Sequence, residues 1–184
     1  RGWRTAGAMA ARGDSFTGML RVFDGVAQPE PMFPGQGTRI AIIHAGGLAP
    51  GMNAAVRAAV RFGISRGHSM VGIRGGFPGL LTDQVQDLDW AAVEGLVGLG
   101  GAELGTSRAT PRTEDYAAVG EAIQRNRIDG LLVIGGHRAY EAMWRLREHR
   151  GDHPGLRIPA ICLPASIDNN LPGSNTSIGG DTAL

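Results

Sequence analysis

The chain has 184 residues, of which 42% are hydrophobic and 19% are charged, so it can bury a core and lacks the composition of a disordered protein. Its 18 basic and 17 acidic residues give a net charge of +1, which excludes the strongly basic balance of a nucleic-acid-binding protein. The single cysteine, Cys162, excludes an internal disulfide framework and favours a reducing, cytoplasmic location, and no apolar run approaches the ~20 residues that cross a bilayer.

Residues 1–37 mix glycine, proline and isolated apolar residues, which predicts a linker or extended lead-in. The Arg- and Ala-rich residues 1–12 also fit a transit peptide, although they lack the apolar core of a secretory signal. Globular structure is expected over residues 38–184. Because the chain opens without methionine and stops where a helix begins, near Asp181, we expect a fragment.

Short apolar runs alternate with amphipathic segments from Thr38 onward. The runs lack strict alternation, so each predicts a strand buried on both faces: Arg39 to His44, Ser69 to Ile73, Leu131 to Ile134 and Ile158 to Leu163. Helical spacing recurs at Asn53 to Arg66, Thr113 to Arg127 and Tyr140 to His149. This order predicts an α/β fold, a three-layer parallel sheet with helices on both faces. Ligands bind such sheets at the carboxyl ends of the strands.

The first glycine-rich loop, residues 45–53, connects a predicted strand to a helix. Gly46 and Gly47 permit close backbone approach, and the helix N-terminus offers free N–H groups to an anion. The loop therefore predicts a phosphate site. A tight turn with Asn53 as helix N-cap is an equally good interpretation.

The second loop, residues 100–108, combines glycines, two hydroxyls and the Arg108 guanidinium, a set suited to phosphate oxygens. A surface arginine after a turn is the alternative. The third loop contains Gly136, His137 and Arg138 and is typical of a strand-to-helix phosphate turn. It has no carboxylate for Mg²⁺, and we interpret His137 as a satisfied polar residue rather than a metal ligand.

The fourth loop, residues 164–173, follows the last predicted strand. Its one carboxylate, Asp168, lies between Ser166 and the amide of Asn170, and a carboxylate at a strand end can take a proton from an alcohol. The alternative is an Asx-turn in which Asp168 satisfies local N–H groups.

Together and in order, these loops resemble the 6-phosphofructokinase family. The resemblance covers residues 38–184. It rests on Gly46-Gly47-x-Ala49-Pro50-Gly51-Met52-Asn53, Gly76-Phe77-x-Gly79-Leu80, Leu104-Gly105-Thr106-x-Arg108, Ile134-Gly135-Gly136, Pro164-Ala165-Ser166-Ile167-Asp168-Asn169-Asn170 and Ser177-Ile178-Gly179-x-Asp181. It implies the Rossmann-like nucleotide lobe of that family, truncated at its C-terminal end, with the second lobe missing.

The family transfers a phosphoryl group from ATP, or from pyrophosphate in some members, to the 1-hydroxyl of fructose 6-phosphate with Mg²⁺. The resemblance implies Asp168 as the catalytic base and Ser166 and Asn170 as substrate contacts. It implies nucleotide or phosphate contacts from Gly46, Gly47, Arg108, Gly136, His137 and Arg138. Implied partners are fructose 6-phosphate or a fructose bisphosphate, ATP and ADP, a second phosphofructokinase half in the same chain, and further copies in a homo-oligomer.

Three acidic positions of the family's catalytic halves differ here. Leu48 replaces an acid, Asn170 replaces an aspartate, and His137 replaces the carboxylate that usually holds Mg²⁺, so we assign no metal ligand. Fewer carboxylates weaken Mg²⁺ binding on Coulomb grounds. Such losses resemble the C-terminal half of a fused, tandem phosphofructokinase, whereas Asp168 argues for catalysis.

Three hypotheses remain open. The chain is part of a glycolytic 6-phosphofructokinase, it is a non-catalytic regulatory half that binds a sugar bisphosphate or nucleotide effector, or it is an inert copy that only completes the assembly.

Overall fold

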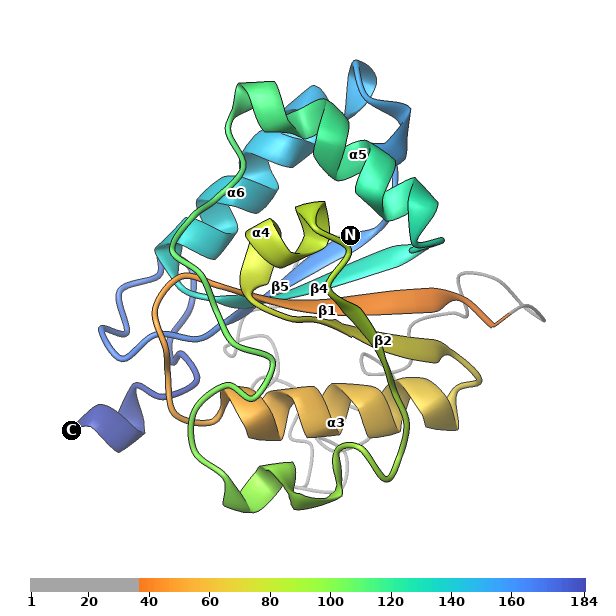
Figure 1. The fold of residues 1–184 in the computed structure, drawn as a ribbon. Helices are drawn as coiled ribbons and strands as arrows, with labels where there is room; N and C mark the ends of the chain where they lie inside the picture. Colours follow the sequence, from red (N-terminus) through yellow and green to blue (C-terminus); the bar gives the residue numbers. More distant parts are fainter. Residues whose placement is uncertain (1–36) are drawn as a thin grey trace, which may run out of the picture. The chain divides into compact units, whose positions relative to one another are not determined.

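The structure, a computed structural model, describes residues 37–184. The linker predicted for residues 1–37 therefore lies almost wholly outside the described residues and stays a prediction. Five strands form one sheet in the order β3-β2-β1-β4-β5 (Figure 1). Their bounds are β1 Arg39–Ala45, β2 Ser69–Ile73, β3 Val85–Leu88, β4 Gly130–Gly135 and β5 Ala160–Pro164.

Four of the strands are parallel, and the fifth is not. β1 pairs with β2 on one side and with β4 on the other, and β4 pairs with β5, all in parallel. β3 runs antiparallel to β2 at one edge, with Met70 opposite Leu88. The prediction of a parallel sheet is thus confirmed for the four predicted strands, and the antiparallel edge strand was not predicted.

Helices cover both faces of the sheet, which confirms the predicted three-layer fold (Figure 1). α3 (Met52–Ser65) lies on one face. α4 (Gly76–Leu81), α5 (Tyr116–Arg125) and α6 (His137–Glu148) lie on the other. Short 3₁₀ turns complete the elements, at Glu94–Gly98, Thr113–Asp115, His149–Gly151, Pro154–Leu156 and Asp181–Ala183. Within residues 37–184, none of the helices combines the length and the apolar character needed to span a bilayer.

Two apolar clusters fill the spaces between the sheet and the helices, one on each face, because the central strands are buried on both faces. Odd-numbered residues of β1, such as Ile43, pack with Phe77 of α4 and Val119 of α5. Ile42, on the opposite face of β1, packs with Val56 of α3 and Val93. Side chains of successive strand residues point to opposite faces, so an uninterrupted apolar run is what such a strand requires.

Candidate functional site

The candidate site lies at the carboxyl ends of β1 and β4, two adjacent strands whose following helices lie on opposite faces of the sheet. After β1 the chain enters α3 on one face, whereas after β4 it enters α6 on the other (Figure 1). Adjacent parallel strands whose connections leave to opposite faces create a crevice at their carboxyl ends, which is the usual ligand position in open α/β sheets. The loops after β1, β4 and β5 gather at this end.

The loop after β1 begins with a glycine that turns the chain sharply. Gly46 has φ of +105°, a left-handed value that favours glycine. Its amide donates a hydrogen bond of 2.8 Å to the carbonyl of Ser107, and its carbonyl accepts one of 3.0 Å from Thr106 Oγ1. The Gly46 amide is therefore already used, whereas Gly47 and Leu48 are exposed at the surface of the loop.

Asn53 joins the first loop to the second. Its side-chain amide donates to the carbonyls of Leu99 and Gly100, both at 3.1 Å, and its Oδ1 accepts from the amide of Glu103 at 2.6 Å. The proposed N-cap role of Asn53 was wrong. α3 begins one residue earlier, with Gly51 at the cap position and no side-chain cap. The buried Asn53 instead holds the 99–103 backbone against the start of α3.

The loop after β4 brings α6 close to the β5 loop. Gly136 is directly followed by α6, so His137 and Arg138 occupy its first turn, and both are exposed. A Cβ atom at Gly136 would lie 3.3 Å from the Cβ of Ser166, and one at Gly46 would lie 3.8 Å from the Gly136 amide nitrogen. The first amides of a helix have no partner within it, so the start of α6 presents N–H groups to the crevice.

The loop after β5 is held by its own C-terminal continuation. Ser177 Oγ donates to the carbonyl of Ser166 at 2.6 Å, and the Ser177 amide donates to Asn169 Oδ1 at 2.8 Å. The amide of Ser166 donates to the Ile178 carbonyl at 3.0 Å. Asn169 adopts φ of +45°, which Asn tolerates better than most residues. These bonds fix the backbone on both sides of Asp168.

The Asp168 carboxylate itself is exposed, and within residues 37–184 no hydrogen bond or ion pair engages it. Its backbone amide donates to Ser166 Oγ at 3.2 Å. The Asx-turn interpretation of Asp168 therefore does not describe this loop, because no N–H within residues 37–184 bonds to its carboxylate, and the neighbouring Asn169 accepts from the Ser177 amide, eight residues later. Asn170 is also exposed.

Arg108 is exposed at the end of the second loop, and no ion pair of the described residues includes it. The preceding residue, Ser107, forms a parallel bridge with Ala45 at the end of β1. The second loop therefore lies directly beside the first. The segment that follows the β5 loop also lies beside the first loop, because a Cβ at Gly179 would lie 3.0 Å from the Pro50 carbonyl oxygen. The structure thus brings all four loops together.

Sequence reasoning missed the residues that hold these loops in place, namely Asn53 in its bridging role, Asn169, Ser177 and the buried His44. Only His44 carried a signal, since it is a polar residue within an apolar strand. Across residues 37–184, no group of three or more His, Cys, Asp or Glu side chains is arranged to hold a metal ion.

Comparisons with known proteins point to one family. A family model described as Phosphofructokinase matches residues 39–184. The chain is 41% identical over 179 residues to the ATP-dependent 6-phosphofructokinase, platelet type, of Rattus norvegicus, covering 96% of this chain and 23% of the relative. It is 41% identical over 186 residues to the ATP-dependent 6-phosphofructokinase of Yarrowia lipolytica, covering 97% and 19%.

Solved structures agree with this match. The phosphofructokinase of Saccharomyces cerevisiae superposes with a TM-score of 0.77 at 38% identity, over 83% of this chain and 20% of the other. A pyrophosphate-dependent phosphofructokinase from Marinobacter aquaeolei, at 19% identity and a TM-score of 0.70, supports the fold alone. The chain spans about a fifth of the length of the eukaryotic relatives.

Proposed function

The chain belongs to the phosphofructokinase family, and from that premise we propose that it is part of a 6-phosphofructokinase that transfers a phosphoryl group from ATP to the 1-hydroxyl of fructose 6-phosphate in glycolysis. We propose that residues 38–184 are the nucleotide lobe of one copy in a tandem protein, most like the C-terminal half. A cytoplasmic location and assembly into a homo-oligomer are part of the same proposal.

One observation carries the proposal. Asp168 is an exposed carboxylate without a partner within residues 37–184, on a loop whose backbone is fixed on both sides and which adjoins the glycine-rich loops after β1 and β4. A structural aspartate on a surface turn normally accepts local N–H groups. The Asp168 carboxylate accepts none within residues 37–184, so it is left available for a substrate.

Phosphoryl transfer needs positioning, charge neutralisation and a proton acceptor. In the proposed step, the Asp168 carboxylate accepts the proton of the sugar 1-hydroxyl. The hydroxyl oxygen then forms a bond to the γ-phosphorus of ATP, while the bond from that phosphorus to the bridging oxygen breaks and ADP leaves with the electron pair. A positioned base contributes roughly 10²–10⁴-fold to such a rate.

We assign the remaining residues by their place around the crevice. Ser166 and Asn170 flank Asp168 and would contact the sugar phosphate. The exposed Gly47 and the first turn of α6, with Gly136, His137 and Arg138, would contact nucleotide phosphates through backbone amides and cationic side chains. Gly46 shapes the turn, since its own amide is bonded to Ser107. Arg108 would neutralise the transferring oxygens.

The residues at the start of α6 do not fit Mg²⁺. This cation prefers oxygen ligands in an octahedral arrangement, whereas His137 offers an imidazole and Arg138 a cation. We propose that His137 stands where the family's carboxylate ligand would be. No residue of this chain is therefore assigned to Mg²⁺, and no step is routed through it.

The regulatory alternative, in which the chain binds a fructose bisphosphate or nucleotide effector without catalysis, uses the same loops. The absence of a carboxylate at Leu48, His137 and Asn170 is the observation that favours it, whereas Asp168 favours catalysis, and a single substitution separates the two.

We predict that Asp168→Asn in the full-length phosphofructokinase lowers kcat at least 100-fold and leaves fructose 6-phosphate affinity within about 3-fold of wild type. The substitution removes the proton acceptor but keeps the size of the side chain. The measurement is steady-state kinetics together with a sugar titration by calorimetry.

The matched control is Asp152→Asn, an exposed aspartate beyond the opposite end of α6, which should leave both quantities unchanged. Turnover by Asp168→Asn near the wild-type rate would remove Asp168 from the mechanism and favour the regulatory alternative.

A further inference from the structure

A histidine lies in the core of the sheet directly beneath the candidate site. His44 is the sixth residue of β1, where it is opposite Ile134 of β4, and its side chain is 0% exposed. It is on the same face of the sheet as Ile42, which packs under α3. A buried polar ring costs free energy relative to an apolar one unless its polar atoms are satisfied.

Only one of the two ring nitrogens has a partner within residues 37–184. Nδ1 lies 3.2 Å from the carbonyl oxygen of Gly105, whereas Nε2 is buried and makes no hydrogen bond. A carbonyl oxygen can only accept, so Nδ1 carries the proton in this contact. Burial lowers the pKa of His44 to about 4, so the ring is neutral near pH 7.

The partner of His44 belongs to the loop that ends in Arg108. Gly105 has φ of +71° and follows Leu104, which is buried. The next residue, Thr106, donates its hydroxyl hydrogen bond to the Gly46 carbonyl. On the other side, the carbonyl of Leu104 accepts from the Gly75 amide at 2.8 Å, beyond the end of β2. The loop is therefore held between the ends of β2 and β1.

We propose that His44 is a positioning residue that fixes the 104–108 loop, and through it the Arg108 guanidinium, against the glycine turn after β1. An apolar residue at position 44 would pack in the core without the cost of the unpaired Nε2. The Nδ1–H contact is thus a directional link from the rigid central strand to a loop that carries a phosphate-binding side chain. This inference rests on the proposed function, because that function assigns Arg108 to phosphate oxygens.

Two substitutions separate the hydrogen bond from the packing. His44→Asn keeps an N–H donor close to the place of Nδ1, whereas His44→Leu has a side chain of nearly the same shape as Asn and no donor. A third variant, His44→Gln, places its amide near the position of Nε2 and serves in place of His44→Leu if that protein does not fold.

Amide hydrogen exchange on the 184-residue chain tests the link without any ligand. The probes are the amides of Gly105, bonded to the Ala102 carbonyl, and Gly46, bonded to Ser107. We expect exchange at both to be at least 10-fold faster in His44→Leu than in wild type and within about 3-fold of wild type in His44→Asn. Equal protection in all three proteins would overturn the inference.

ATP binding, measured by calorimetry on the full-length phosphofructokinase, tests the consequence. His44→Leu should weaken ATP binding about 10-fold, and Arg108→Ala should weaken it as well. Because His44 acts through Arg108, adding His44→Leu to Arg108→Ala should produce no further loss. An equal loss in both backgrounds would show a purely structural role and would overturn the inference. If Arg108→Ala binds ATP as wild type does, the assignment of Arg108 to phosphate oxygens fails, while the exchange result still decides the role of His44.

Discussion

Gly135 shows how one residue allows the two walls of the crevice to approach. It is the last residue of β4 and lies opposite Ala45 of β1. A Cβ atom there would overlap the Ala45 carbonyl oxygen and lie 2.8 Å from the Cβ of Ala139 in α6. The backbone of β1 and the first turn of α6 can therefore both contact β4 only if position 135 carries no side chain.

We predict that Gly135→Ala lowers the free energy of unfolding by about 1–3 kcal/mol, because neither the neighbouring carbonyl nor the α6 backbone can move aside freely. Thermal and urea unfolding of the 184-residue chain measure it. Gly151→Ala is the matched control, since a Cβ there meets no atom within 4 Å and the change should stay within about 0.5 kcal/mol. Equal stability of the two variants would contradict the overlap.

The roles of single residues were the least predictable from sequence. Asn53 precedes a helical segment and so predicts an N-cap, yet it bonds to backbone atoms 46 to 50 positions further along the chain. Asp168 and Asn169 both suit a turn, and only the position of Ser177, eight residues after Asn169, shows that Asn169 and not Asp168 accepts its N–H. These assignments depend on distant contacts that no local pattern contains.

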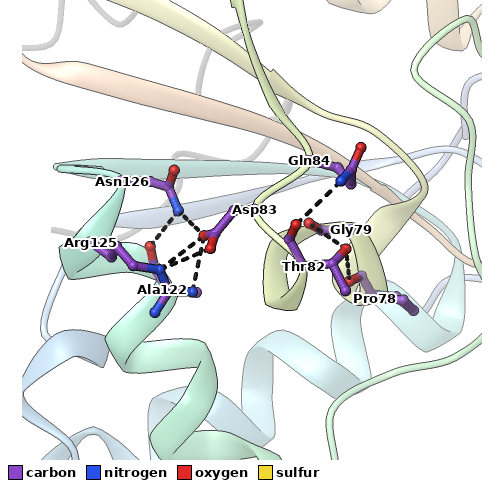
Figure 2. Close-up of polar contacts among 8 residues, drawn as sticks. All are labelled: Pro78, Gly79, Thr82, Asp83, Gln84, Ala122, Arg125 and Asn126. Atoms are coloured by element: carbon purple, nitrogen blue, oxygen red, sulfur yellow. Dashed lines mark hydrogen bonds and ion pairs between the residues drawn. The ribbon is translucent and has the colours of Figure 1, made fainter.

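Hydrogen bonds among Asp83, Arg125 and Asn126 hold the ends of α4 and α5 together, and we call these three side chains the clamp (Figure 2). Asp83, just after α4, has φ of +55° and accepts hydrogen bonds from Arg125 Nε at 2.9 Å and Asn126 Nδ2 at 2.7 Å. Arg125 Nη2 also donates to the carboxylate, at 3.0 Å. Arg125 and then Asn126 hold the pKa of Asp83 below its ordinary value. The clamp joins the C-terminal ends of two helices on the same face of the sheet.

We predict that the clamp stabilises the fold above the ordinary aspartate pKa of about 3.9 and loses this contribution as the pH falls through the lower pKa of folded Asp83. The sign follows because the folded state holds the charged form more strongly than the unfolded state does. Asp83→Asn keeps a side chain that tolerates positive φ and removes the charge.

Melting temperatures from pH 2 to pH 7 provide the measurement. Near neutral pH the melting temperature of the wild type should be slightly higher than that of Asp83→Asn, and the margin is small because Asp83 and Arg125 are both exposed. The difference in melting temperature should shrink at low pH and at high salt. A difference that is constant with pH would show that the charge of Asp83 does not contribute.

Element prediction succeeded where apolar runs are long and failed where other rules govern. The predicted strands at residues 39–44 and 69–73 match β1 and β2 closely, because both are buried on two faces. α4 was missed because its sequence contains two glycines and a proline, which disfavour helix formation in isolation. β3 was missed because it is short, polar and half-exposed at the edge of the sheet. α6 begins three residues before its predicted start, directly after Gly136.

At the scale of the whole sheet, β5 is an edge with an apolar surface. It pairs with β4 on one side, and within residues 37–184 the further bonds to its backbone come from the Ile178 amide to the Pro164 carbonyl and from the Tyr140 hydroxyl to the Cys162 carbonyl, at 3.3 Å. Ile161 is 63% exposed and Trp144 of α6 is 61% exposed. A groove of about 420 Å³ lined by Trp144, Met143 and Cys162 lies between α6 and this edge. Exposed apolar edges promote pairing between chains.

We predict that the 184-residue chain self-associates at micromolar concentrations and that Ile161→Lys shifts it towards the monomer, because a charged residue on an edge strand opposes strand addition. Sedimentation velocity measures the distribution. Val97→Lys is the control, since Val97 is 64% exposed on a 3₁₀ turn that packs with α3 and does not belong to the edge strand. If both variants associate as wild type does, the edge of β5 is not the contact.

The fold class was predictable from sequence because parallel strands, glycine-rich loops and amphipathic helices alternate in a fixed order. The place of the crevice followed from the rule for strand ends, whereas the order of the strands did not, since it depends on pairings between distant segments. β1 pairs first with the next strand and then, on its other side, with a strand much later in the chain.

That second pairing has a kinetic meaning. The amide of Arg39 at the start of β1 bonds to Asp129, 90 residues later in the sequence, just before β4 begins. The crevice therefore does not exist until the polypeptide has closed this long loop, and non-local closures of this kind are slow steps in folding. A unit of only β1, α3 and β2 would have one wall of the crevice and lack the wall formed by β4 and α6, so phosphate ligands should act on the last stage of folding and leave the first collapse unaffected.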